Sequence, residues 1–199
     1  MADMRKLRAA AILFCVAAMV ITMACSETDA KTWTDPASCL TWQVTPTGGK
    51  KTWSYAKSHC AGLSLDGYKD WRLPTIDELR TLIRGCPSTI TGGSCNVEEG
   101  DCLAWPCRDN ESRSVCPSYH GPGEGGCYWP DEMEGTCIWY WSSSSVGGGE
   151  AWAVNFDYGH VYNDGTGVDL HVRCVRDSGV DTNCLAACDC GDCGDADGG

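Results

Sequence analysis

The sequence predicts an α+β domain in which two short helices precede a small antiparallel sheet. Apolar residues first recur with helical spacing, in residues 52–61 and again after Thr75. Strand-like segments rich in aromatic and apolar residues then follow at 138–144, 152–156 and 170–175. Helices and strands that are separated along the chain in this way favour an α+β domain over an alternating α/β domain.

The first elements of this domain are a strand and a helix. Residues 40–44 alternate apolar and polar side chains, which predicts a strand with one buried face. Trp53, Ala56 and Cys60 then lie at positions i, i+3 and i+7, so they share one face of a short amphipathic helix. Gly62 is expected to end this helix.

The second helix begins within residues 67–79, which read GYKDWRLPTIDEL. The hydroxyl of Thr75 can accept a hydrogen bond from the backbone of Glu78. The Glu78 carboxylate can accept one from the Thr75 amide, and together these bonds form a capping box. We expect Trp71 at the centre of the core and Arg72 paired with a nearby carboxylate.

The periodicity is lost in residues 86–136, where Gly, Pro, Ser and Cys dominate. A structureless loop of this length inside a compact domain needs something to hold it. Disulfides could do so, each contributing roughly 2–4 kcal/mol. The cysteines that could do so are Cys86, Cys95, Cys102, Cys107, Cys116 and Cys127. We therefore interpret residues 86–136 as a disulfide-stapled insert.

The N-terminus has the features of an export signal. Basic residues precede an apolar run at residues 9–21, which is shorter than a membrane-spanning helix needs. Residues 1–24 are therefore predicted to be a signal peptide. Lipoprotein processing would cleave the chain before Cys25, attach lipid to Cys25 and leave residues 25–32 as a spacer. The sequence departs from the usual lipoprotein cleavage motif at Thr22, where Leu, Val or Ile is common. The alternative is ordinary cleavage nearby, with Cys25 an unpaired thiol.

Charge excludes one class of partner. The leader holds Arg5, Lys6 and Arg8 against Asp3, so its removal changes the formal charge from −12 to −14. Such a surface repels phosphate backbones, and there is no basic stripe to offset it, so nucleic acid binding is not expected.

Cysteine usage also indicates an oxidising compartment. The chain has 16 cysteines, and setting aside Cys15 and Cys25 leaves 14 for up to seven disulfides. The pairing cannot be deduced from the sequence alone. The tail, residues 179–199, holds CxC and CxxC spacings that could bind zinc, but two disulfides are favoured in an exported chain.

Three motifs resemble the bacterial DUF1566 family, also called the Lcl C-terminal domain. These are GYKDWRLPTIDEL, WSYAKSHC at residues 53–60, and AWAVNF at 151–156 followed by VRCVR at 172–176. We take the domain as residues 33–178. The resemblance implies a C-type-lectin-like fold, shared with formylglycine-generating enzymes. It also implies a disulfide between Cys60 on the first helix and Cys174 in the last strand.

The aromatic residues suggest a binding surface, because exposed rings stack on sugars or anchor protein partners. Trp139 and Trp141 share one face of a predicted strand, so one or both are expected in the core. Trp105, Tyr128 and Trp129, in the insert, are the better candidates to contact a ligand.

A calcium site is a further possibility, since clustered carboxylate and carbonyl oxygens bind this ion. Asp157, Asn163, Asp164 and Asp169 gather before the last strand, and Asn163 and Asp164 are also candidate ligand contacts. The sequence Tyr-Asn-Asp resembles the lectin Trp-Asn-Asp motif, but the partner Glu-Pro-Asn or Gln-Pro-Asp motif is missing. Residues 158–167 are expected to form a polar loop, and the alternative to a calcium site is a turn-rich loop in which Asn, Asp and Gly are the usual residues.

Catalysis has little support in the sequence. The four histidines lack metal spacing such as HExxH, and none belongs to a nucleophile motif. We therefore expect an exported, lipid-anchored, non-catalytic module that binds a surface glycan or an extracellular protein. It would sit at the outer membrane or cell surface, or otherwise be periplasmic or secreted. The alternatives are a structural component of the envelope with no small ligand and, third, an enzyme related to formylglycine generation.

Overall fold

The computed structural model describes residues 31–93, 116 and 120–179. The predicted signal peptide, the lipidation at Cys25, the ring of Trp105 and the cysteine-rich tail lie outside these residues.

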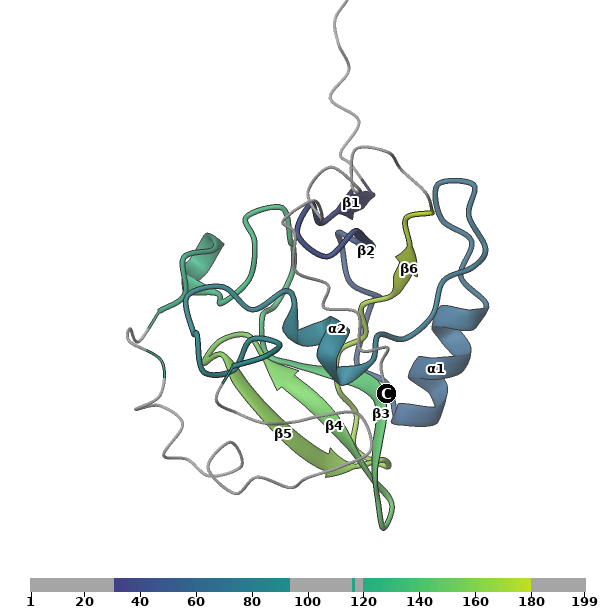
Figure 1. The fold of residues 1–199 in the computed structure, drawn as a ribbon. Coiled ribbons are helices and arrows are strands. Elements are labelled where there is room, and N and C mark those ends of the chain that lie inside the picture. Colours follow the sequence, from purple (N-terminus) through teal and green to yellow (C-terminus); the bar gives the residue numbers. More distant parts are fainter. Residues whose placement is uncertain (1–30, 94–115, 117–119, 180–199) are drawn as a thin grey trace, which may run out of the picture.

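The strands form two small antiparallel sheets (Figure 1). The first has the order β1-β2-β6, with strands Thr32–Thr34, Leu40–Gln43 and Val175–Asp177. The second has the order β3-β4-β5, with strands Trp139–Gly147, Glu150–Asn155 and His160–Gly165. Both termini of the domain thus meet in one sheet, while the other sheet is a meander of consecutive strands.

The two predicted helices are present. Helix α1 spans Trp53–Ala61 and Gly62 follows it as the C-cap. Helix α2 spans Ile76–Arg80 and begins with the predicted capping box between Thr75 and Glu78. A short 3-10 helix, η3, spans Glu124–Gly126. Together with the sheets, these helices confirm the α+β class. The lectin-like assignment stays a prediction.

Each face of the sheet β3-β4-β5 packs against one helix, which produces two core clusters. On one face, Ile76 and Leu79 of α2 pack in a cluster with Tyr140, Trp152 and Val154. On the other face, α1 lies against β3, and its Ala56 and Cys60 belong to the same cluster as Trp141, Ala151 and Ala153. The side chains of Trp42, Trp71 and Trp141 are all buried, as expected for Trp71.

Two expectations for the end of the domain are wrong. Residues 158–167 were expected to form a loop, but they contain β5, which pairs with β4 from Glu150↔Gly165 to Asn155↔His160. Residues 170–175 were expected to form the last strand, but β6 begins only at Val175. The segment before β6 makes isolated bridges, Lys51↔Leu170 and Tyr140↔His171. The short strand β1 was not predicted.

Three disulfides join described residues. Cys60–Cys174 links α1 to the chain before β6, as the family resemblance implied. Cys86–Cys116 joins the start of the insert to its middle, and Cys127–Cys137 fixes its end ahead of β3. Gly159 lies against the second bridge with φ 66°, and a Cβ there would lie 3.1 Å from the Cys116 sulfur. Only glycine suits this backbone conformation and this spacing.

Within the described residues, none of the helices combines the length and the hydropathy needed to cross a membrane.

Candidate functional site

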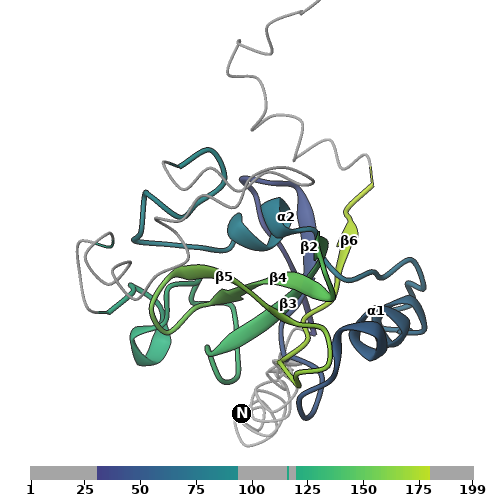
Figure 2. The same cartoon turned by 90° about the horizontal axis from the view of Figure 1, so that it is seen from below.

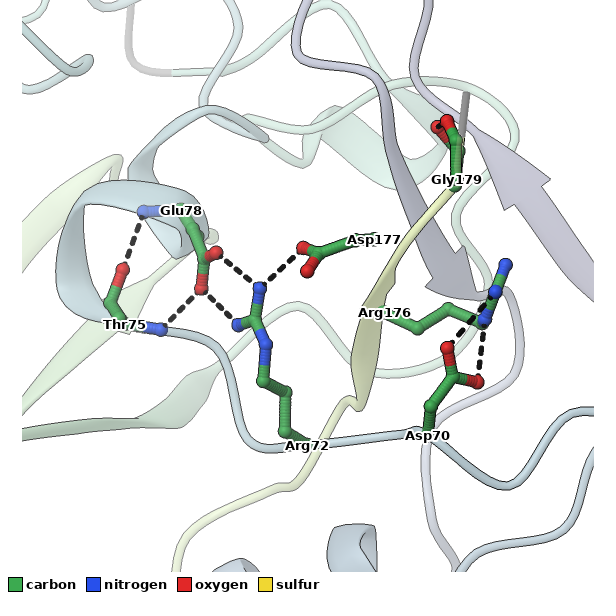
Figure 3. A network of polar contacts seen from close by, with 8 residues as sticks. Asp70, Arg72, Thr75, Glu78, Arg176, Asp177 and Gly179 are labelled. Carbon is green, nitrogen blue, oxygen red and sulfur yellow. Dashed lines mark hydrogen bonds and ion pairs between the residues drawn. The ribbon is translucent and has the colours of Figure 1, made fainter. Parts of the chain in front are cut away.

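The charged residues of the GYKDWRLPTIDEL stretch form a network with β6 (Figure 3). The Arg72 guanidinium donates two hydrogen bonds of 2.6 Å to the Glu78 carboxylate and one of 2.8 Å to Asp177. Glu78 also accepts a bond of 2.8 Å from the Thr75 amide. One carboxylate therefore caps α2 and, through Arg72, ties it to the last strand.

The protonation states follow from these contacts. Hydrogen bonding to Glu78 raises the pKa of Arg72, so the guanidinium stays charged. Burial alone would raise the pKa of Glu78, but the hydrogen bonds from Arg72 and Thr75 outweigh it and lower the pKa.

A second pair joins the same segments. Arg176 of β6 donates bonds of 2.9 and 3.0 Å to Asp70, and this pairing lowers the pKa of Asp70. The Arg176 guanidinium also lies 3.8 Å from the centre of the Tyr68 ring. Because each of these charged groups is already paired, the GYKDWRLPTIDEL stretch serves to hold the fold together.

Arg173 is a buried cation held by neutral groups. Its guanidinium donates to the backbone carbonyls of Gln43, Val44 and Glu134. It also lies 5.0 and 5.4 Å from the ring centres of Trp129 and Tyr140. Burial lowers the pKa of Arg173. Its contacts are all internal, so it supports the core.

The expectation that Tyr128 and Trp129 contact a ligand is wrong, because each is only 1 % exposed. The Trp129 ring packs against Tyr140 and Phe156, with centroids 5.8 and 5.4 Å apart. The Tyr128 amide donates to the Phe156 carbonyl. Backbone pairing and ring packing therefore place both side chains in the core. Trp105, the third candidate of the insert, lies outside the described residues.

The four residues considered for calcium do not converge. Asn163 and Asp164 are neighbours in β5, so their side chains point to opposite faces. Asn163 is 2 % exposed and donates to Glu150. Asp157 precedes β5 and Asp164 lies near the end of this strand, so most of the strand, at about 3.3 Å per residue, separates the two carboxylates. Asp169 follows the strand. No three His, Cys, Asp or Glu side chains within the described ranges could hold a metal ion.

The structure does bring together a different set of residues, on the face of β5 opposite Asn163. His160, Tyr162 and Asp164 alternate along this face, and all three are partly exposed. Trp139 of β3 lies on the same face, diagonally across β4, and is also partly exposed. The rings of Trp139 and Tyr162 are 5.8 Å apart at an angle of 55°. We call Trp139, Tyr162 and Asp164 the aromatic face.

This surface has the groups that recognise a polar ring with an apolar side. Two aromatic side chains supply the apolar contact, and Asp164 supplies carboxylate oxygens that accept hydrogen bonds. One of these oxygens accepts a bond of 2.7 Å from the Gly165 amide, which orients the carboxylate. Tyr162 was not among the predicted contacts. The alternation of side chains from His160 to Asp164 is the signal that could have identified it.

Hollows elsewhere are less suited to a ligand. One of about 440 Å³ is lined by Asp35 and Arg84 together with Ile83, Ile90 and Thr91. Its charges are already used, since Arg84 lies 3.3 Å from the buried Asp35 carboxylate. Another, of about 390 Å³, lies between α1 and the start of the domain.

The fold and the bridges define a disulfide-bonded α+β domain, a class suited to an oxidising compartment outside the cytoplasm. A family model, Lcl C-terminal domain, matches residues 31–176, so the chain belongs to the Lcl C-terminal domain family. A comparison with curated proteins found no match. Family and disulfides together are those of an extracellular or cell-envelope domain.

Proposed function

We propose that this protein is a non-catalytic binding module of the cell envelope and that it binds a carbohydrate on the aromatic face. The observation that supports this is the partly exposed pair of Trp139 and Tyr162, 5.8 Å apart, with Asp164 on the same face. Buried aromatic pairs are common in cores, whereas a partly exposed pair beside an oriented carboxylate suits a ligand.

The chemistry of a sugar matches this surface in two ways. The C–H face of a pyranose can pack on an aromatic ring, and its hydroxyls can donate to a carboxylate. Since the rings of Trp139 and Tyr162 meet at 55°, neither covers the whole face of the other. Asp164 lies two residues from Tyr162 on the same side of β5, within reach of hydroxyls on a ring stacked there.

The non-catalytic part of the proposal is supported by the pairing of the charged side chains. The carboxylates of Glu78 and Asp70 are bound to Arg72 and Arg176. A general acid or base needs a side chain free to exchange a proton with a substrate.

A glycan array tests the proposal. The mature chain, residues 25–199 with its disulfides intact, would be applied with calcium and again with chelator. We expect saturable binding to a defined set of glycans that is the same in both conditions, because the predicted calcium ligands do not converge. An array without binding in either condition would instead favour an extracellular protein partner or a structural role in the envelope.

A further inference from the structure

Positive charge is concentrated around α1 in an otherwise acidic chain. No Asp or Glu occurs between Asp35 and Asp66, while the same stretch holds Lys50, Lys51 and Lys57. The whole chain has a formal charge of −12. The negative charge of the whole chain predicts that it repels polyanions. The electrostatic field at the surface around α1 depends mainly on nearby charges, so it can differ in sign from the field of the whole chain.

Lysines lie on both flanks of the exposed side of α1. On one flank, Lys51 has its ammonium 5.5 Å from the centre of the Tyr55 ring. On the other flank, the ammonium of Lys57 lies 3.3 Å from the centre of the Trp53 ring. Lys50 is exposed just before the helix, and Tyr55 is 58 % exposed. We call Lys50, Lys51, Tyr55 and Lys57 the α1 surface.

This composition is that of a protein surface that rests on lipid headgroups. Tyrosine and tryptophan place an apolar ring and a polar tip at the boundary between water and acyl chains. Lysine stems lie along the apolar surface while the ammonium groups reach the phosphates. The exposed residues between the flanks, Ser54 and Ser58, are small and uncharged, so they neither repel a bilayer nor hold it away.

The chain enters the domain on this same side. Lys31, exposed at the start of the described residues, lines the hollow of about 390 Å³ together with Thr47, His59 and Leu63. His59 belongs to α1 and shares a hydrogen bond of 2.9 Å with Thr47. If Cys25 carries lipid, the six residues from there to Lys31 span at most about 20 Å. A tether this short keeps the α1 side near the bilayer.

The α1 surface shares no residue with the aromatic face, although Trp139 packs against the core cluster of α1 on the same side of the sheet. In both views the start of β5 lies across the molecule from α1 (Figures 1 and 2), whereas the chain just after β5 reaches α1, since the Trp53 amide donates to the Thr166 carbonyl. An acidic residue marks a border of the α1 surface: exposed Asp169 lies next to Leu170, which exchanges backbone hydrogen bonds with Lys51. The surface is therefore limited in extent, which predicts weak, salt-sensitive attachment rather than insertion.

We propose that the α1 surface contacts an anionic phospholipid bilayer and so orients the domain on its membrane, beyond what a lipid anchor does alone. The proposal uses residues other than those of the carbohydrate site. It can therefore fail or succeed independently of the proposed function.

Flotation with vesicles tests the inference. The mature chain would carry Cys25→Ser, so that no lipid is attached, and would be mixed with vesicles of phosphatidylcholine alone or with added phosphatidylglycerol. We expect binding only to the anionic vesicles and its loss in high salt. Lys50→Gln with Lys57→Gln should weaken the partition roughly thirty-fold.

Lys69→Gln is the matched control, since Lys69 is an exposed lysine of the GYKDWRLPTIDEL stretch and is not part of the α1 surface. It should weaken binding much less than the double variant. Equal binding to both kinds of vesicle, no binding to either, or equal effects of the Lys69 and α1 variants would each overturn the proposal.

Discussion

Replacing Glu78 by Gln should lower the free energy of unfolding by about 1–2 kcal/mol at neutral pH. Gln keeps the size of the side chain and can still accept from the Thr75 amide, so the capping box is retained. What the substitution removes is the charge that Arg72 contacts with two hydrogen bonds of 2.6 Å.

The magnitude follows from partial burial. Hydrogen bonds to a charged group contribute roughly 1.5–3 kcal/mol when shielded from water, and much less when exposed. The Arg72 side chain is 38 % exposed and that of Glu78 is 21 % exposed, so solvent screens part of the interaction. Arg72 also keeps its bond to Asp177, which limits the loss further.

The effect should depend on pH with a defined sign. The folded protein lowers the pKa of Glu78 below its ordinary value of 4.5. The stability that the charged form contributes is thus fully present above about pH 4.5 and is lost as the pH falls through the lower, folded-state pKa. The difference between the native protein and Glu78→Gln should be constant near pH 7 and shrink in acid.

Urea unfolding at several pH values measures this difference. Glu132→Gln is the matched control, because Glu132 is an exposed acid and should change stability by less than about 0.5 kcal/mol. The reasoning is refuted if both variants have the same stability at pH 7, or if the Glu78 variant differs equally from the native protein at pH 3 and pH 7.

Three further predictions concern the core, the bridges and metal. Trp71→Ala, at a side chain only 2 % exposed, should cost about 3–5 kcal/mol in urea unfolding, and an unchanged melting temperature would contradict its place in the core. Replacing Cys60 and Cys174 together by Ala opens a loop of 114 residues and should cost about 4–5 kcal/mol, measured under oxidising conditions; a loss below 1 kcal/mol would argue against this pairing. A chelator should leave the melting temperature unchanged, and a rise on adding calcium would show a site that the described residues do not form.

Local chemistry was sufficient to predict some elements from the sequence. The capping box depends only on Thr75 and Glu78, three residues apart, and the face of α1 depends only on helical spacing. The bond between Cys60 and Cys174 joins residues 114 apart, so only the family resemblance could suggest it.

Other elements depend on contacts between distant segments. β5 contains Asn, Asp and Gly, which favour turns, but pairing with β4 overrides that preference. The burial of Trp129 results from packing on Tyr140 and Phe156, which the composition of the insert does not reveal. Trp139 and Tyr162 meet only because of the register of three strands.

The affinity of Tyr162→Ala for a glycan found on the array tests carbohydrate binding most directly. Tyr55→Ala is the matched control, since it removes an exposed tyrosine from α1 instead of β5. A stacking ring contributes about 1.5 kcal/mol to the free energy of binding. Tyr162→Ala should therefore raise the Kd about ten-fold, while Tyr55→Ala should leave it unchanged. A Kd unchanged by Tyr162→Ala, in a variant that melts like the native protein, would contradict a carbohydrate site on the aromatic face.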